Sequence, residues 1–446
     1  MSMVITDVRV EKQRRTRAVE VAVVFVVAVA WNAWRLSSAS MWADEVSTTQ
    51  HTARGFSGIV DVIRQLDAVM APYYFGIEAF TSVFGTSDAA FRFPSVLAIG
   101  VAASAFYLLA RKYVDSLGAV VAVLLVIAAP SMTRYAQEAR VYAFVVAGVV
   151  LSTLLLHEAA ERGSRRWWVC YSVVLASVGA GHIVGLMIIA AHVLFARSRR
   201  VPNRAFIGAL APAVIVGCTL AVIGHFQSGV IGWIPKGGYR RLQNAEKILL
   251  GGDRPTILLI VSCVGFAAWT LSRRDRRRTL GWLLVPLSAP VLLWLVGHTT
   301  HIFSARYVVW MVPFYVLAAV IVWRRLGTTI TIAATAGLLI LWVPQQADVR
   351  SSDGHLVAYR DVAEFLDGQV TPGDAVRASE EATRLSVERY SSRLAAGGCA
   401  ESGAVTWELV RSDQIDVSKT CFPGTEPDRT FRFRGVWVGV YERAKG

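Results

Sequence analysis

Long apolar runs alternate with short polar stretches over the first three quarters of the chain. Lipid offers the backbone no water to bond, so an apolar run crosses a bilayer only as a helix that satisfies its own hydrogen bonds. Eleven such runs can be recognised, and the chain is predicted to be an all-α membrane protein with about eleven transmembrane helices. They lie at about residues 19–34, 93–110, 117–130, 141–156, 167–180, 183–195, 206–223, 256–271, 280–296, 307–323 and 328–343.

The first run follows a basic segment and precedes small residues near Ala39, so it could be a cleaved signal peptide. We favour an uncleaved first span, because apolar runs continue for some 300 residues beyond it.

Basic residues are distributed unequally between alternate loops. The N-terminus and the loops near residues 111, 162–166, 197–204, 273–278 and 324 carry roughly 21 Lys and Arg, about twice the number in the short loops of the other set. The positive-inside rule places the basic set in the cytoplasm. The loops at residues 35–92, 131–140, 225–255 and 297–306, together with the C-terminal region, are then extracytoplasmic, and the protein is predicted to be a multi-pass inner (plasma) membrane protein.

Composition supports this assignment and argues against a nucleic-acid partner. The chain is 54% hydrophobic and only 17% charged, with a formal net charge of +14. A nucleic-acid-binding protein gathers its basic residues on one surface, whereas these form short clusters between apolar runs. The excess of Arg over Lys, with abundant Ala and Val, suggests a GC-rich genome, such as an actinobacterial one.

Residues 344–446 are polar enough to form a small soluble domain beyond the membrane domain of residues 1–343. Helical patterns at 361–366 and 380–394, and strand patterns at 375–378 and 430–441, predict an α/β fold. Cys399 and Cys421 could form a disulfide if this domain faces an oxidising compartment.

Two adjacent carboxylates, Asp44 and Glu45, follow the first span directly. A carboxylate at the membrane surface can accept a proton from a substrate hydroxyl. Asp44 could instead cap the helix that begins near Val46, and the two roles are compatible.

Other ionisable and aromatic residues gather in the same set of loops, where they could shape a cavity. Glu138 can pair with either neighbouring Arg, while the Tyr pair and Arg92 could also serve as ordinary membrane-interface residues. These candidates are Tyr73, Tyr74, Arg92, Arg134, Glu138 and Arg140.

Basic residues beside aromatic ones in the last two outer loops could bind a lipid phosphate, or simply anionic headgroups. The candidates are Lys236, Tyr239, Arg240 and Arg306. His298 and His301 are spaced so that they could share a metal ion, but no carboxylate cluster accompanies them, and hydrogen bonding is favoured for His301. No metal site is assigned and no cofactor is required by the sequence, although a divalent cation is not excluded.

Four segments together resemble the GT-C membrane glycosyltransferases, in the branch shared by protein O-mannosyltransferases and lipid A aminoarabinose transferases. They read WADE at 42–45, APYYF with VFGTSDAAFRFPS over 71–95, RYAQEARVYAF at 134–144 and FSARYVVWMVPF at 303–314. Met70-Ala71-Pro72 stands where the family usually has His-Pro-Pro.

The resemblance implies inverting transfer of a sugar, most simply mannose, from a polyprenyl-phosphate donor to a cell-envelope lipid, glycan or protein. It implies that Asp44 is the general base, that Glu45 positions the acceptor or the loop, and that Arg306 with Lys236 or Arg240 stabilises the phosphate leaving group.

Two alternatives stay open. An arabinofuranosyl- or aminosugar-transferase would share this architecture, and the sequence does not separate the sugars. A transporter or flippase for lipid-linked sugars is less favoured, because the ionisable residues crowd one face and no repeated halves are visible.

Overall fold

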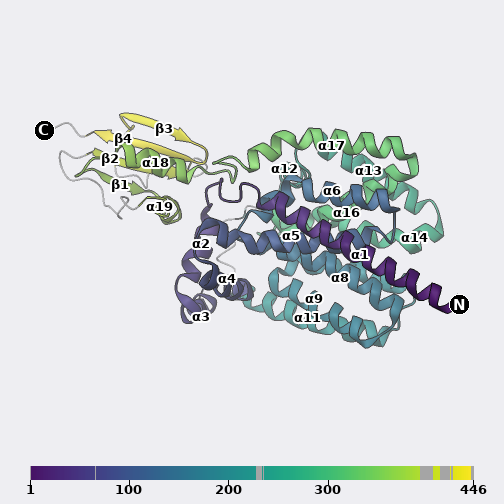
Figure 1. The fold of residues 1–446 in the computed structure, drawn as a ribbon. Coiled ribbons are helices and arrows are strands. Elements are labelled where there is room, and N and C mark those ends of the chain that lie inside the picture. The colour runs from purple at the N-terminus through teal and green to yellow at the C-terminus, as the bar shows by residue number, and fades with distance from the viewer. Residues whose placement is uncertain are drawn as a thin grey trace.

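The computed structural model describes residues 2–65, 67–227, 234, 236–391, 405–411, 422 and 425–442. The proposed disulfide partners Cys399 and Cys421 lie outside these residues. Figure 1 shows a long helical bundle with a small sheet at one end, and the N-terminus at the opposite end.

The first half of the chain forms α1 to α11 with two short 3-10 turns. These elements are α1 (Ser2–Ala33), α2 (Ala43–Thr52), α3 (Gly55–Gln65), η1 (Ala68–Met70), α4 (Ala71–Phe84), α5 (Asp88–Ala110), α6 (Ser116–Ala128), α7 (Pro130–Ala136), α8 (Tyr142–Arg162), α9 (Arg165–Gly181), η2 (Ile183–Met187), α10 (Ile188–Ser198) and α11 (Asn203–Phe226).

The second half of the bundle ends in a helix that leads to the sheet. Its elements are α12 (Tyr239–Leu250), α13 (Asp253–Leu271), α14 (Arg274–Leu280), η4 (Gly281–Leu283), α15 (Leu284–Gly297), η5 (Ala305–Met311), α16 (Val312–Leu326) and α17 (Thr328–Val349).

Among the described residues, eight helical segments are long and apolar enough to cross a membrane, and the bent pair α6–α7 makes a ninth if it is one span. The other two predicted runs form α9, of 17 residues, and the shorter apolar segment η2–α10. The prediction of a multi-pass, helical membrane protein is confirmed, while the count of eleven spans stays a prediction.

Local sequence explains where these helices begin and bend. The side chains of Ser87 and Asp115 accept bonds from backbone N–H groups in the first turns of α5 and α6. Pro130 has no N–H to continue the helix, so the chain bends by 57° between α6 and α7. Beyond this bend, Arg134 of α7 donates a hydrogen bond to the carbonyl of Gly354, in the segment that leads to the sheet.

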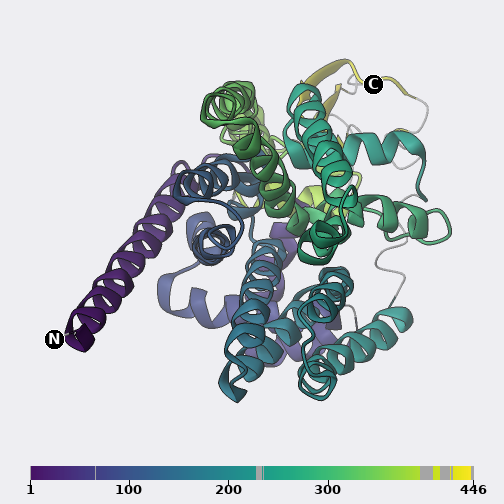
Figure 2. The ribbon, with the colours of Figure 1, turned by 90° about the vertical axis from the view of Figure 1, so that its right-hand side faces the viewer.

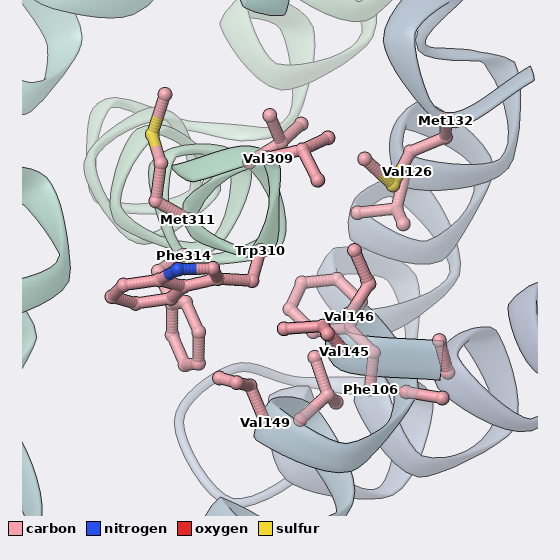
Figure 3. Packing of buried hydrophobic residues seen from close by; sticks show 14 of the residues in the cluster. Phe106, Val126, Met132, Val145, Val146, Val149, Val309, Trp310, Met311 and Phe314 are labelled. Carbon is pink, nitrogen blue, oxygen red and sulfur yellow. The ribbon is translucent and has the colours of Figure 1, made fainter. Parts of the chain in front are cut away.

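A dense apolar core fixes α5, α6, α8 and α16 relative to one another. Phe106, Val146 and Val149 meet Trp310 and Phe314 in this core (Figure 3). Because η5 and α16 are locked here, the residues at the start of η5 have a fixed position relative to α5 and α8. By contrast, α1 packs along α5 at the edge of the bundle with its apolar stretch largely exposed, as lipid contact requires (Figure 2).

The C-terminal region contains α18 (Tyr359–Gln369), β1 (Ala375–Ala378), α19 (Glu381–Glu388), β2 (Val405–Arg411), β3 (Arg429–Phe433) and β4 (Val436–Glu442). The strand order is β1-β2-β4-β3, with β1 parallel to β2 and the other pairs antiparallel. Apolar residues of α18 and α19 pack against the sheet in a core separate from that of the bundle.

The predicted α/β character is confirmed, with two differences in the element boundaries. The last membrane helix continues to Val349, because the polar residues after 343 end the apolar run without ending the helix. The predicted helix at 380–394 ends at Glu388, where Arg389 and Tyr390 instead bond Asp88 at the start of α5. The end of α19 therefore depends on long-range hydrogen bonds, which the local sequence pattern does not predict.

This docking joins the C-terminal region to the bundle. Asp88 accepts bonds from Arg360, Arg389 and Tyr390, all from the C-terminal region. The Tyr390 hydroxyl also accepts a bond from the Met41 backbone N–H, in the segment that precedes α2. The C-terminal region therefore holds the loop that carries the two acidic candidates.

Candidate functional site

The acidic pair lies at the start of α2, and helix geometry separates its two side chains. Asp44 and Glu45 are consecutive residues of the first turn, and consecutive helical side chains point about 100° apart. The helix begins at Ala43, so Asp44 lies inside it, and the Trp42 N–H at the preceding position is bonded by Glu45 at 3.4 Å. The alternative prediction that Asp44 caps this helix is therefore wrong.

Asp44 faces two guanidinium groups from distant parts of the chain. Its Oδ2 atom accepts a bond from Nη1 of Arg306 at 2.9 Å and lies 3.9 Å from Nη2 of Arg140. The Asp44 side chain is 28% exposed, against 11% for Arg306 and 13% for Arg140. The carboxylate thus has access to solvent while both cations lie mostly below the surface.

Aromatic rings surround the Arg306 guanidinium. Its carbon lies 5.2 Å from the centre of the Trp42 ring, 5.9 Å from that of Tyr142 and 5.7 Å from that of Tyr307. Cation–π contacts of this kind orient a guanidinium without consuming its N–H donors. The group is therefore held in place while its donors can turn toward an anion.

Glu45 lies in a different, sealed environment. Its carboxylate accepts two bonds from Arg92, at 2.8 and 2.9 Å, and one from the Ala139 N–H at 2.8 Å. Arg92 also donates to the carbonyls of Leu36, Ala39 and Ser40, and both side chains of the ion pair are fully buried. Arg92 thus ties the segment before α2 to α5 rather than facing a cavity.

The C-terminal region completes this buried cluster through His355. The Nδ1–H of its buried ring donates to Oε2 of Glu45 at 3.1 Å. Burial lowers the pKa of His355 to about 3, so the ring is neutral at neutral pH. Burial alone would raise the pKa of Glu45, but the Arg92 charge and the hydrogen bonds from His355 and Arg92 lower it well below its ordinary value.

Glu138 lies between the two clusters and is buried with an incomplete set of bonds. Its Oε2 accepts from Nε of Arg134 at 3.2 Å, while Oε1 has no hydrogen-bond partner in the described part of the chain. Burial raises the pKa of Glu138 to about 7, against the opposing effect of Arg134 and with the help of the Glu45 charge. Arg134 also donates to the Gly354 carbonyl, so it too holds the C-terminal region.

The tyrosine pair lies next to this site on α4. The Tyr74 hydroxyl donates to Asp67 at 2.8 Å and its ring packs edge-on against His51. The Tyr73 hydroxyl is buried without a partner among the described residues, and its ring packs on Phe144. Burial raises the pKa of both hydroxyls, so neither provides a base at neutral pH.

The remaining candidates make no hydrogen bond or ion pair with Asp44 in the described part of the chain. Lys236, Tyr239 and Arg240 are exposed and make no side-chain hydrogen bond or ion pair with the described residues. They belong to the start of α12 and the segment before it, and α12 packs against η5, which carries Arg306. We call Lys236, Tyr239 and Arg240 the rim. His301 donates to the Ile234 carbonyl and makes no bond to Asp44.

Two residues of this architecture were not predicted from the sequence. His355 bonds Glu45 across 310 positions, and Asp88 anchors residues more than 270 positions away. Asp88 belongs to the segment at 83–95, whose pattern could have pointed to it, whereas nothing local distinguishes His355. Over the described ranges, no group of three or more His, Cys, Asp or Glu residues could hold a metal ion.

Comparison with protein families gives a match to part of the chain. The family model for dolichyl-phosphate-mannose-protein mannosyltransferases matches residues 68–224, which include Arg92, Arg134, Glu138 and Arg140. No curated protein sequence gives a significant match.

Solved structures match the fold over most of the chain. ArnT from Cupriavidus metallidurans bound to undecaprenyl phosphate matches with a TM-score of 0.59 at 11% identity, covering 94% of this chain and 97% of that one. AglB from Archaeoglobus fulgidus, an oligosaccharyltransferase in complex with an inhibitory peptide and a dolichol-phosphate, matches with a TM-score of 0.53 at 11% identity, covering 89% of this chain and 69% of that one. The predicted resemblance to GT-C glycosyltransferases is confirmed, and the chain has their fold.

Proposed function

We propose that this chain, a multi-pass membrane protein with the GT-C fold, is an inverting glycosyltransferase that uses a polyprenyl-phosphate sugar donor. The proposal rests mainly on the contact between Asp44 and Arg306, which are 262 residues apart and meet at 2.9 Å at a partly exposed position. A carboxylate that can take a proton and a guanidinium that can hold a phosphate then lie side by side. These are the two charges that such a transfer requires.

The chemistry follows from this juxtaposition. Asp44 accepts the proton of an acceptor hydroxyl while the hydroxyl oxygen attacks the anomeric carbon of the donor. The bond between that carbon and the phosphate oxygen breaks, and the lipid phosphate leaves with both electrons. Arg306 and Arg140 stabilise the negative charge that develops on the leaving phosphate.

Other residues hold this geometry. Glu45, Arg92 and His355 fix the loop that carries Asp44, since all three are buried. Tyr73, Tyr74, Arg134, Glu138 and His301 lie around the site and shape the space that the acceptor enters. The rim carries positive charge that attracts a lipid phosphate toward the site.

We further propose that the donor is mannosyl-linked, that the site faces outside the inner membrane, and that the acceptor is a cell-envelope lipid, glycan or protein. The match to the mannosyltransferase family model supports mannose, and the surplus of basic residues in the opposite loops supports the orientation. Residues 344–446 would then form an extracytoplasmic domain, and a Cys399–Cys421 disulfide would suit that compartment.

A transfer assay tests the function. Purified protein in lipid nanodiscs is incubated with cell-envelope extract and a panel of labelled polyprenyl-phosphate sugars that includes mannose, arabinofuranose and amino sugars. We expect label in a new glycoside with one sugar of the panel, and none with Asp44→Asn. Asp253→Asn, which removes an exposed Asp at the start of α13, is the matched control and keeps full activity.

Two outcomes would contradict the proposal. Full transfer by the Asp44→Asn protein would remove the base assignment. Movement of the labelled lipid across the bilayer without formation of a glycoside would instead favour a flippase.

A further inference from the structure

A cavity of about 630 Å³ lies between the end of α10 and the segment that runs from the end of α13 through α14 to η4. Five arginines line it, namely Arg197, Arg200, Arg274, Arg277 and Arg278. In Figure 1, α14 is at the end of the bundle that carries the N-terminus, whereas α2 and Asp44 are at the end that carries the sheet. This cavity is therefore separate from the candidate active site, and its end of the bundle faces the viewer in Figure 2.

The charge of this cavity is not balanced by the protein. No carboxylate lines it, and Asp275, the acidic residue of α14, is absent from the lining. Within the described part of the chain, none of the five guanidinium groups makes a hydrogen bond or an ion pair. At the other end of the bundle, Arg92, Arg140 and Arg306 each face a carboxylate. Five clustered cations without a counter-charge repel one another, so a bound anion would be stabilised.

The cavity also has a defined wall. Trp282 lines it, is 2% exposed, and donates its indole N–H to the Tyr113 hydroxyl at 3.1 Å. The Trp282 ring also packs against those of His157, Phe195 and Phe314. Contacts on several sides hold Trp282 in place and give the cavity a fixed shape. Basic residues that served only to set the orientation in the membrane would not need such a shape.

Apolar residues beside the arginines indicate how the ligand is attached. Leu194 and Leu271 line the cavity and are 44% and 53% exposed. Guanidinium groups bind phosphate oxygens with paired N–H donors. We propose that this cavity binds the phosphate of an anionic phospholipid headgroup, whose acyl chains lie along the exposed leucines. This site does not depend on the proposed transferase activity.

Lipid binding to the full-length protein tests the proposal. Delipidated protein in neutral detergent is titrated with phosphatidylglycerol or phosphatidylcholine, and bound lipid is counted by native mass spectrometry. Two triple variants remove the same charge: R200Q/R277Q/R278Q inside the cavity, and R165Q/R204Q/R273Q outside it, on exposed residues of the basic set of loops. Inorganic pyrophosphate, added as a competitor, distinguishes a free phosphate ligand from a lipid.

We expect one saturable phosphatidylglycerol site, weakened at least about tenfold by the cavity triple and less than about twofold by the control triple. Competition by millimolar pyrophosphate would support a phosphate site whose ligand is soluble, and its absence would support the lipid. Equal weakening by both triples, or equal binding of phosphatidylcholine, would overturn the proposal. If the cavity triple does not fold, the single variants R277Q and R278Q, compared with R273Q, decide between these outcomes by the same criterion.

Discussion

Asp44 and Glu45 are adjacent in sequence but differ in almost every physical respect. The Asp44 side chain is 28% exposed and has Arg306 as its close partner, whereas Glu45 is fully buried and bonded to Arg92, His355 and the Ala139 N–H. The difference arises because successive residues of a helix point in different directions and α2 lies at a boundary between solvent and protein. In the proposed mechanism, the partly exposed Asp44 takes part in the chemistry and the buried Glu45 holds the loop.

The largest expected effect separates chemistry from folding at this pair. Asp44→Asn removes the proton acceptor, and transfer is expected to fall by about 10³-fold, within the range for loss of a general base. The Tm should stay within a few degrees of the original value, because Asp44 is partly exposed and the amide oxygen of Asn can still accept a bond from the mostly buried Arg306. Steady-state transfer and thermal unfolding of the same preparation check both quantities. A large fall in Tm would make Asp44 a structural residue.

Glu45→Gln should produce the opposite pattern. The substitution leaves the Arg92 guanidinium buried without its counter-charge. Loss of one partner of such a buried ion pair lowers the free energy of unfolding by about 3–5 kcal/mol. We expect a marked fall in Tm, and expect Glu45→Leu with Arg92→Met to recover much of it, because that pair removes both charges. Thermal unfolding in one detergent compares the three proteins. Unchanged stability of Glu45→Gln would contradict the assignment of this cluster as the support of the loop.

Arg306→Lys keeps the charge beside Asp44 and removes the planar fork of donors. A lysine cannot hold a phosphate through paired N–H groups, so kcat should fall by about 10- to 100-fold. Measuring kcat and KM for the donor tests this, with Arg325→Lys on α16, the helix that directly follows η5, as the matched control. An unchanged kcat would place the leaving phosphate elsewhere.

The rim should act on binding rather than on the chemical step. Lys236→Gln combined with Arg240→Gln removes two exposed charges, which are worth about 1 kcal/mol each near an anionic surface. The expected result is a higher KM for the lipid donor with little change in kcat, and weaker salt dependence. A fall in kcat as large as that of Arg306→Lys would mean that these groups contact the reacting phosphate.

The smallest effect concerns Glu138, whose pKa is raised to about 7. A carboxyl group with a raised pKa in the folded state stabilises the protein below its unfolded pKa, and that contribution is lost as pH rises through about 7. The Tm of Glu138→Gln, which lacks this titration, should therefore gain a few degrees on the original protein between pH 5 and pH 8. A constant difference across that range would contradict the buried, protonated state.

The elements of the site differ in how far the sequence could reveal them. The segments at 42–45, 134–144 and 303–314 each carry short, ordered patterns, so the meeting of Asp44, Arg140 and Arg306 could be expected from topology and resemblance. The burial of Glu45 could not, because it depends on bonds from Arg92, Ala139 and His355, which lie far from it in the sequence. His355 could not be found either, since its role exists only when residues 310 positions apart come together.

The elements of the fold also differ in how far the sequence could predict them. Hydropathy located every helix of the bundle that is long enough to cross a membrane, and period-two alternation located the β3–β4 hairpin. It did not find β2, which forms the centre of the sheet with partners on both sides. It also missed the end of α19, where Arg389 and Tyr390 bond Asp88. Features that depend on local periodicity could be predicted from the sequence, while features that depend on long-range hydrogen bonds could not.

The most direct test of the account is a structure of this protein with undecaprenyl phosphate bound. The phosphate is expected between Asp44 and Arg306, with its oxygens accepting bonds from the Arg306 guanidinium, which would exchange its contact with Asp44 for the ligand. A phosphate seated against other residues, with Asp44 and Arg306 still bonded to each other and no lipid between them, would contradict it.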